Sequence, residues 1–221
     1  MNKVGFNVLA WSAAVSEELF PTIERLKRIG YDGVEFYLGG DDQKSYQQMG
    51  NFTKELGLET TAVITLGSNE NPVSESAEVR ARALDKIKWA VDRAHALNAT
   101  IICGPFHSAH TLFVNRPAIE VEYQRAGEVL RAAGEYAAQA NITFALEALN
   151  RFECYLCNTS EQLLKLVKEA NHPHVQAMFD THHANIEEKS YGVALDTIAP
   201  VLAHVHISEN DRGTPGSGQV L

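Results

Sequence analysis

Short apolar runs recur along the chain, separated by longer segments in which apolar residues are spaced three or four positions apart. The runs are rich in Val, Ile and Phe, and several show little alternation of apolar and polar positions. That pattern is typical of strands covered on both faces. Strands are therefore predicted at residues 4–9, 33–38, 60–66, 100–103, 142–147, 175–180 and 203–208.

The segments between these runs have the pattern of amphipathic helices. In the first of them, Leu19, Ile23, Leu26 and Ile29 recur at helical spacing, and Gly30 follows as a stop. Helices are predicted at residues 18–29, 42–56, 74–97, 118–140 and 160–170. Regular alternation of strand and helix predicts a parallel sheet with helices outside it.

The alternation favours a barrel over a doubly wound sheet, because no glycine-rich phosphate loop follows the first strand. The predicted fold is α/β, a (β/α)₈ TIM barrel, in a single domain over residues 1–221. Seven strand positions occur before Leu221. The C-terminal βα unit is therefore expected to be missing, and the barrel to be truncated after its seventh strand.

Composition and charge narrow the function classes. The chain of 221 residues is 45% hydrophobic and 21% charged, which argues against a disordered protein. Its net charge of −9 disfavours nucleic acid and anionic membranes as partners. With neither a signal peptide nor an apolar stretch of about 18 residues, a cytoplasmic protein is expected. The CxxC pair Cys154 and Cys157 has no second pair, and is predicted to be two packing thiols.

Polar residues stand at the ends of three successive predicted strands. Glu147 ends the fifth, Asp180 ends the sixth, and the seventh contains His204 and His206, which point to the same side of the sheet. In a TIM barrel, polar residues at the carboxyl ends of strands indicate catalysis. Two carboxylates and an imidazole that converge there suit one divalent cation, Mn²⁺ or else Mg²⁺ or Co²⁺, better than a closed zinc site. The acidic pair Glu187 and Glu188 is expected to be a solvated helix start.

Four motifs carry a resemblance to a known family. The sequences ALEALNRFE at 145–153, DTHHANIEE at 180–188, HVHISENDR at 204–212 and PGSG at 215–218 resemble signatures of ketose 3-epimerases, the D-tagatose/D-psicose 3-epimerase group. The wider superfamily is the xylose-isomerase-like barrels. The resemblance covers nearly the whole chain, and implies a small-molecule ketose as substrate and a homodimer or homotetramer.

Residue roles follow from this resemblance position by position. Glu147 is implied to be a metal ligand and one of two acid/base carboxylates, and Asp180 and His206 to be further ligands. The resemblance also implies that Glu153, His183 and Arg212 bind the sugar. Trp11 matches a tryptophan in the family's pocket, and His107, in the loop after the fourth strand, is a further candidate substrate contact. Glu35, inside the second strand, is given no catalytic role.

The function predicted is divalent-metal-dependent epimerisation of a ketose at C3, by removal and return of a proton through an enediolate. The family's fourth ligand and second acid/base is a Glu on the eighth strand, which is expected to lie beyond Leu221. Three alternatives stay open. They are an aldose–ketose or hydroxypyruvate-type isomerase, a non-catalytic sugar-binding barrel and, least favoured by the net charge, a repair nuclease.

Overall fold

Seven parallel strands form one sheet in the computed structural model, which describes residues 2–40 and 42–220. Each strand pairs with the next along the chain, so the sheet order is β1 to β7. The strands are β1 (Gly5–Asn7), β2 (Gly33–Tyr37), β3 (Glu59–Val63), β4 (Ile101–Gly104), β5 (Thr143–Leu146), β6 (Val175–Asp180) and β7 (Leu202–His206). All seven predicted strands are confirmed, and β6 has the predicted bounds.

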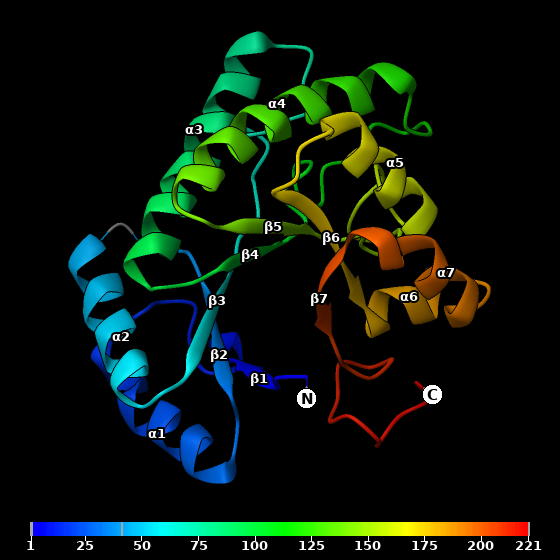
Figure 1. The fold of residues 1–221 in the computed structure, drawn as a ribbon. Coiled ribbons are helices and arrows are strands. Elements are labelled where there is room, and N and C mark those ends of the chain that lie inside the picture. The colour runs from blue at the N-terminus through cyan, green and yellow to red at the C-terminus, as the bar shows by residue number, and fades with distance from the viewer. Residues whose placement is uncertain (1, 41, 221) are drawn as a thin grey trace.

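The helices lie outside the curled sheet (Figure 1). They are α1 (Phe20–Ile29), α2 (Gln43–Glu55), α3 (Ala77–Ala96), α4 (Glu120–Gln139), α5 (Ser160–Ala170), α6 (Thr181–Glu187) and α7 (Tyr191–Ile198), with short 3₁₀ turns at Val8–Ala10, Glu17–Leu19 and Ala199–Val201. The five predicted helices are confirmed. Two further helices, α6 and α7, were not predicted; both are short and pack against β6.

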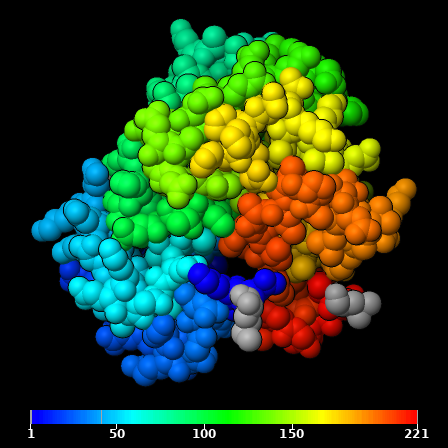
Figure 2. All heavy atoms as spheres, in the orientation of Figure 1, coloured from blue at the N-terminus to red at the C-terminus, as the bar shows by residue number. Residues whose placement is uncertain are grey.

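The sheet is an open barrel, because β1 and β7 are its two edges and no described strand pairs with both. Figure 2 shows a hollow between the N-terminal segment and the β7 region on this open side. Val205 and Ile207, at the β7 edge, are 43% and 68% exposed. The described residues therefore form an open arc of seven strands, as the predicted α/β barrel fold requires.

Two apolar clusters hold the arc together. The larger lies between sheet and helices and includes Ile102, Phe144 and Leu166, none of which is accessible to solvent. It also contains Cys154 and Cys157, which are buried and free, so their prediction as packing thiols is confirmed. The smaller cluster contains one inward-facing residue from each of four neighbouring strands, which are Val63 of β3, Cys103 of β4, Ala145 of β5 and Met178 of β6. Within the described ranges, no helix is both long enough and apolar enough to cross a membrane.

Candidate active site

Three side chains meet where β5, β6 and β7 end. Glu147 follows the last residue of β5, Asp180 ends β6, and His206 ends β7 in direct register with Asp180. His206 Nδ1 lies 3.9 Å from Glu147 Oε1 and 3.7 Å from Asp180 Oδ2. The structure thus brings together the three residues predicted as metal ligands, with one nitrogen facing two carboxylate oxygens.

Asp180 has two separate tasks, one for each carboxylate oxygen. Its Oδ1 accepts hydrogen bonds from the backbone N–H groups of His182 at 2.7 Å and His183 at 3.1 Å, and so caps α6. This leaves Oδ2 facing His206. Burial would raise the pKa of Asp180, but the His206 ring that faces it and the nearby His183 hold that pKa below its ordinary value.

His183 is also close to these carboxylates, with its Nε2 3.6 Å from Glu147 Oε1. Ligand atoms of Glu147, Asp180 and His183 lie within 4.8 Å of one another, so distance alone does not select the third ligand. Hydrogen bonding selects it. The backbone N–H of Asn150 donates to His183 Nδ1 at 3.0 Å. Nδ1 is therefore an acceptor, the proton of the neutral ring is on Nε2, and that nitrogen has no lone pair for a metal.

His206 has the opposite arrangement. Its Nε2 lies 2.7 Å from Glu35 Oε1, a carboxylate oxygen that only accepts, so Nε2 carries a proton. Although burial opposes it, Glu35 and Asp180 raise the pKa of His206 well above its ordinary value, so a cation bound at Nδ1 would replace a second ring proton. Burial lowers the pKa of His183 to about 4, which keeps this ring a neutral donor. The hydrogen bonds therefore favour His206 over His183 as a ligand. They place His183 as a hydrogen-bond donor beside Glu147.

Glu147 has a strongly shifted acid–base equilibrium. Burial, followed by the charges of Asp180 and Glu35, raises its pKa to about 8, against the opposing effect of His206. A carboxyl group whose pKa is raised by burial and by neighbouring carboxylates is typical of a functional site, and a bound cation would favour its charged form. Two carboxylate oxygens and one imidazole nitrogen fit Mn²⁺, Mg²⁺ or Co²⁺.

A second polar group lies beside the first and contains the other predicted sugar contacts. Arg212 donates to Glu153 Oε1 at 2.7 Å, and Asn150 Nδ2 donates to the same oxygen at 2.8 Å. His110 Nε2 lies 3.5 Å from Glu153 Oε2. Asn150 therefore links Glu153 to His183. This link was not predicted, although Asn150 is part of the motif at 145–153.

Two predicted substrate contacts lie apart from this cluster. His107 is fully buried, and its Nε2 donates to the backbone carbonyl of Glu147 at 2.8 Å, so it supports the chain behind the carboxylate. Trp11 is 54% exposed and its ring is 4.9 Å from that of Phe6. It borders a surface hollow that it shares with residues of α1 and contains none of the strand-end carboxylates.

The acidic pair at the end of α6, Glu187 and Glu188, is not a solvated helix start, and that expectation was wrong. Glu187 pairs with Arg151 at 2.8 Å, and its side chain is only 5% exposed. Glu188 Oε1 accepts from the backbone N–H of Ser160 at 2.6 Å. Both glutamates thus fasten α6 to neighbouring segments, which helps to fix Asp180 and His183. Glu209 also holds a neighbouring backbone segment, because its carboxylate accepts a hydrogen bond from the backbone N–H of Gly216 at 2.6 Å.

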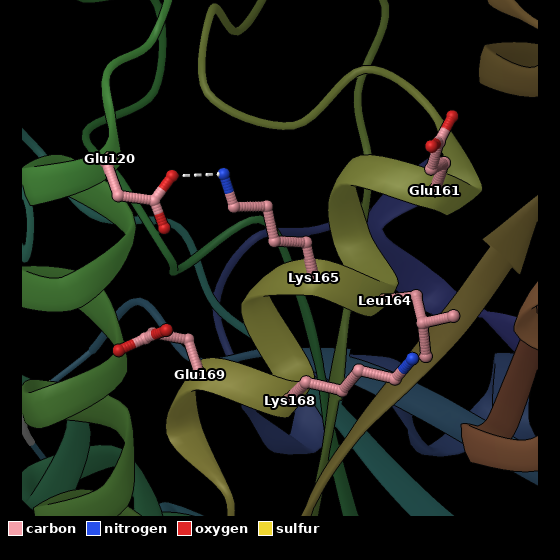
Figure 3. Close-up of a pocket in the computed structure, with 6 residues that line it drawn as sticks. All are labelled: Glu120, Glu161, Leu164, Lys165, Lys168 and Glu169. Atoms are coloured by element: carbon pink, nitrogen blue, oxygen red, sulfur yellow. Dashed lines mark hydrogen bonds and ion pairs between the residues drawn. The ribbon is translucent and has the colours of Figure 1, made fainter.

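A surface depression of about 490 Å³ between α4 and α5 lies outside the site. Figure 3 shows its lining, which consists of Glu120, Glu161, Leu164, Lys165, Lys168 and Glu169. Lys165 donates to Glu120 at 2.6 Å, and both side chains are largely exposed. These residues come from the outer helices alone, so the depression is a solvated helix surface.

The topology and the strand-end cluster define a parallel α/β barrel with its polar site at the carboxyl ends of the strands. A family model described as xylose isomerase-like TIM barrel matches residues 23–221, and the chain belongs to that family.

Several relatives of the chain are sugar epimerases. It is 30% identical to the D-psicose 3-epimerase of Agrobacterium fabrum, over 99% of this chain and 77% of that protein. It is also 30% identical to the L-ribulose 3-epimerase of Mesorhizobium japonicum, over 100% of this chain and 74% of that one. The 3-dehydro-D-guloside 4-epimerase of Escherichia coli is 27% identical, over 91% of this chain and 78% of that protein.

Solved structures give the same picture. An L-ribulose 3-epimerase matches with a TM-score of 0.93 at 27% identity, covering 100% of this chain and 74% of the other. A D-psicose 3-epimerase crystallised in the presence of D-fructose matches with a TM-score of 0.89 at 29% identity, covering 99% of this chain and 77% of the other. The fold prediction and the resemblance to ketose 3-epimerases are confirmed.

Proposed function

We propose that this chain carries the site of a divalent-cation-dependent ketose 3-epimerase, with Glu147, Asp180 and His206 as ligands. The observation that carries the proposal is that both carboxylates face the same nitrogen of His206, Nδ1, at 3.7 and 3.9 Å. The 3-epimerase relatives at 30% identity support it. Mn²⁺ is the cation proposed first, because the donor set is rich in oxygen.

The chemistry required is removal of the hydrogen on C3, the carbon next to the ketone. A bound divalent cation supplies charge that stabilises the oxygens of the enediolate. Glu147 removes or returns the C3 proton through its carboxylate. The opposite face of C3 needs a second proton carrier, and we assign that part to the glutamate that the family resemblance places on an eighth strand.

The neighbouring groups suit a neutral sugar. His183 presents Nε2–H beside Glu147 and donates to a substrate oxygen, while Asn150 holds its ring in place. Arg212 is already paired with Glu153, so their charges largely cancel. Hydroxyl groups bind well to such paired donors and acceptors, whereas a phosphate group needs a cation that is not already neutralised. We therefore propose free ketoses rather than ketose phosphates as substrates.

Exchange of substrate hydrogen in D₂O with Mn²⁺ tests the reaction. The proposal expects deuterium at C3 of a free ketose, and less of it with the corresponding ketose phosphate. Exchange at C3 without appearance of the epimer means that only the face served by Glu147 is active. Deuterium at C1 or C2 instead indicates an aldose–ketose isomerase, and deuterium at C4 a reaction like that of the guloside relative. Sugar binding without any exchange contradicts the proposed catalysis.

Glu147→Gln tests the assignment of the base. Because a positioned general base contributes about 10²–10⁴-fold, the rate of C3 exchange is expected to fall by that factor. Glu169→Gln, on the outer surface of α5, is the matched control and should keep the wild-type rate. Circular dichroism checks that both variants are folded. If Glu147→Gln exchanges C3 as fast as the control, Glu147 is not the base.

A further inference from the structure

Glu35 is a buried carboxylate that the proposed mechanism does not use. It lies in the middle of β2, points into the barrel and is only 4% exposed. A charge in such a place is costly unless hydrogen bonds satisfy it. Its Oε1 lies 2.9 Å from Asn7 Nδ2 and 2.7 Å from His206 Nε2, and its Oε2 lies 2.8 Å from Thr61 Oγ1, 3.0 Å from Cys103 Sγ and 3.0 Å from His204 Nε2.

Two interpretations of this cluster compete. Ligand atoms of Glu35, Cys103, His204 and His206 lie within 4.8 Å of one another, which is the size of a soft-metal site. The other donors argue against a metal there. Asn7 Oδ1 accepts from the backbone N–H of Leu9, so the amide is oriented with its NH₂ group toward Glu35. Together with the Thr61 hydroxyl, it occupies lone pairs of both carboxylate oxygens, and the cluster is a hydrogen-bond network.

The network reaches the candidate metal site through one ring. Glu35 accepts a hydrogen bond from His206 Nε2, and the other nitrogen of the same ring faces Glu147 and Asp180. We propose that Glu35 is a positioning residue, which fixes the tautomer and the orientation of His206 so that Nδ1 faces the cation. This inference rests on the proposed function, because it takes Glu147, Asp180 and His206 as ligands.

His204, the second histidine of β7, also binds the Glu35 carboxylate. His204 and His206 are two positions apart, so both point to the same side of the strand, and each contacts a different carboxylate oxygen. Two attachments prevent the carboxylate from rotating and connect β7 to β2 across the barrel interior. A carboxylate behind a ligating histidine both orients the ring and makes it a better ligand, and its loss weakens metal binding.

Calorimetric titration with Mn²⁺ tests the inference on the whole chain. Glu35→Gln should weaken Mn²⁺ binding by about 10–100-fold, the usual cost of losing such a partner. Thr61→Val is the matched control. It removes one donor to Oε2 but leaves the bond to His206, so its affinity should stay within about threefold of wild type. Glu35→Gln that is folded and binds Mn²⁺ as tightly as the control overturns the proposal.

The ¹⁵N spectrum of the imidazole rings tests the same bond without metal and without a variant. At a pH where His206 is neutral, the metal-free wild type should hold its proton on Nε2 alone. A mixture of tautomers, or a proton on Nδ1, overturns the role of Glu35 whether or not Mn²⁺ binds. A fixed Nε2–H tautomer in a chain that does not bind Mn²⁺ supports the positioning of the ring by Glu35, and contradicts the proposed metal function alone.

Discussion

His183 and His206 are in contact with the same carboxylate, Glu147, but the atoms behind them give them different chemistry. A backbone N–H donates to one ring and a carboxylate accepts from the other. One histidine therefore presents an N–H group to the site, and the other presents Nδ1, the nitrogen that can bind a cation when the ring is neutral. The identity of the residue does not determine which role it takes. The partner on the far side of the ring does.

His107 gives a test at the residue scale on a histidine that is not itself a proposed metal ligand. It is fully buried, and burial lowers its pKa to about 4, although its hydrogen bond to the Glu147 carbonyl opposes this. In the unfolded chain a histidine titrates near pH 6.5. Between these two values the unfolded state binds the extra proton, so folding stability falls as the pH falls through this window.

His107→Gln should remove this acid sensitivity. From pH 6.5 to 4, wild type is expected to lose up to about 3 kcal/mol of unfolding free energy relative to the variant. Urea unfolding of both proteins across this range measures the difference. Comparing the two proteins cancels the contribution of His183, which has the same sign. A difference that stays constant with pH contradicts a neutral buried His107.

Residues that act through a strand end were predictable, and residues that act across the barrel were not. Glu147 and Asp180 end predicted strands and His206 lies near the end of another, so their position along the chain already marks them. Glu35 lies inside such a run, and its importance depends on His206, which is 171 positions away. The alternation of side chains along β2 places Glu35 on the inward face, and this could have suggested its role. The tautomers depend on contacts that no sequence pattern contains.

At the scale of elements, the regular βα alternation was sufficient to predict seven strands and five helices. It missed α6 and α7 because they are short, at 7 and 8 residues, and depend on tertiary support. Asp180, Tyr191 and Glu187 provide that support. The Tyr191 hydroxyl, for example, donates to the Thr181 carbonyl at 2.9 Å.

Helix packing on the outer layer gives a prediction at the same scale. Gly50 lies inside α2, where a Cβ atom would come within 2.5 Å of the Ala96 carbonyl oxygen and 2.8 Å of the Leu97 carbonyl carbon. Both contacts are with backbone atoms, which cannot shift without a cost in folding free energy. Gly50→Ala should therefore destabilise the protein by about 1–3 kcal/mol, despite the better helix propensity of Ala.

Gly192, in α7, is the matched control. A Cβ atom there has only Ser190 Oγ nearby, at 3.9 Å. Gly192→Ala should stabilise the protein by up to about 1 kcal/mol, because only helix propensity changes. Urea unfolding of the two variants measures both effects. Equal stabilisation by the two substitutions contradicts the close approach of α2 to the end of α3.

On the scale of the whole molecule, exposed apolar side chains indicate where the chain meets other surfaces. One group follows Thr111, whose backbone N–H donates to the Glu153 carbonyl at 3.0 Å. This apolar loop patch consists of Leu112, Phe113, Val114 and, next to Glu153, Phe152, which are 37%, 43%, 38% and 72% exposed. Exposed apolar groups concentrated beside a site are typical of an interaction surface. The homo-oligomer expected from the family resemblance can use it.

Association through this patch is the last prediction. For a chain that forms the homodimer implied by the family resemblance, Phe113→Asp combined with Phe152→Asp should leave monomers, because each charge must be desolvated in the contact. Light scattering after size exclusion measures the mass. Ile207→Asp, which alters an exposed side chain at the β7 edge, is the control and should leave the dimer intact. If the control dissociates the dimer and the double variant does not, the open edge of the barrel is the interface, and the apolar loop patch has another role.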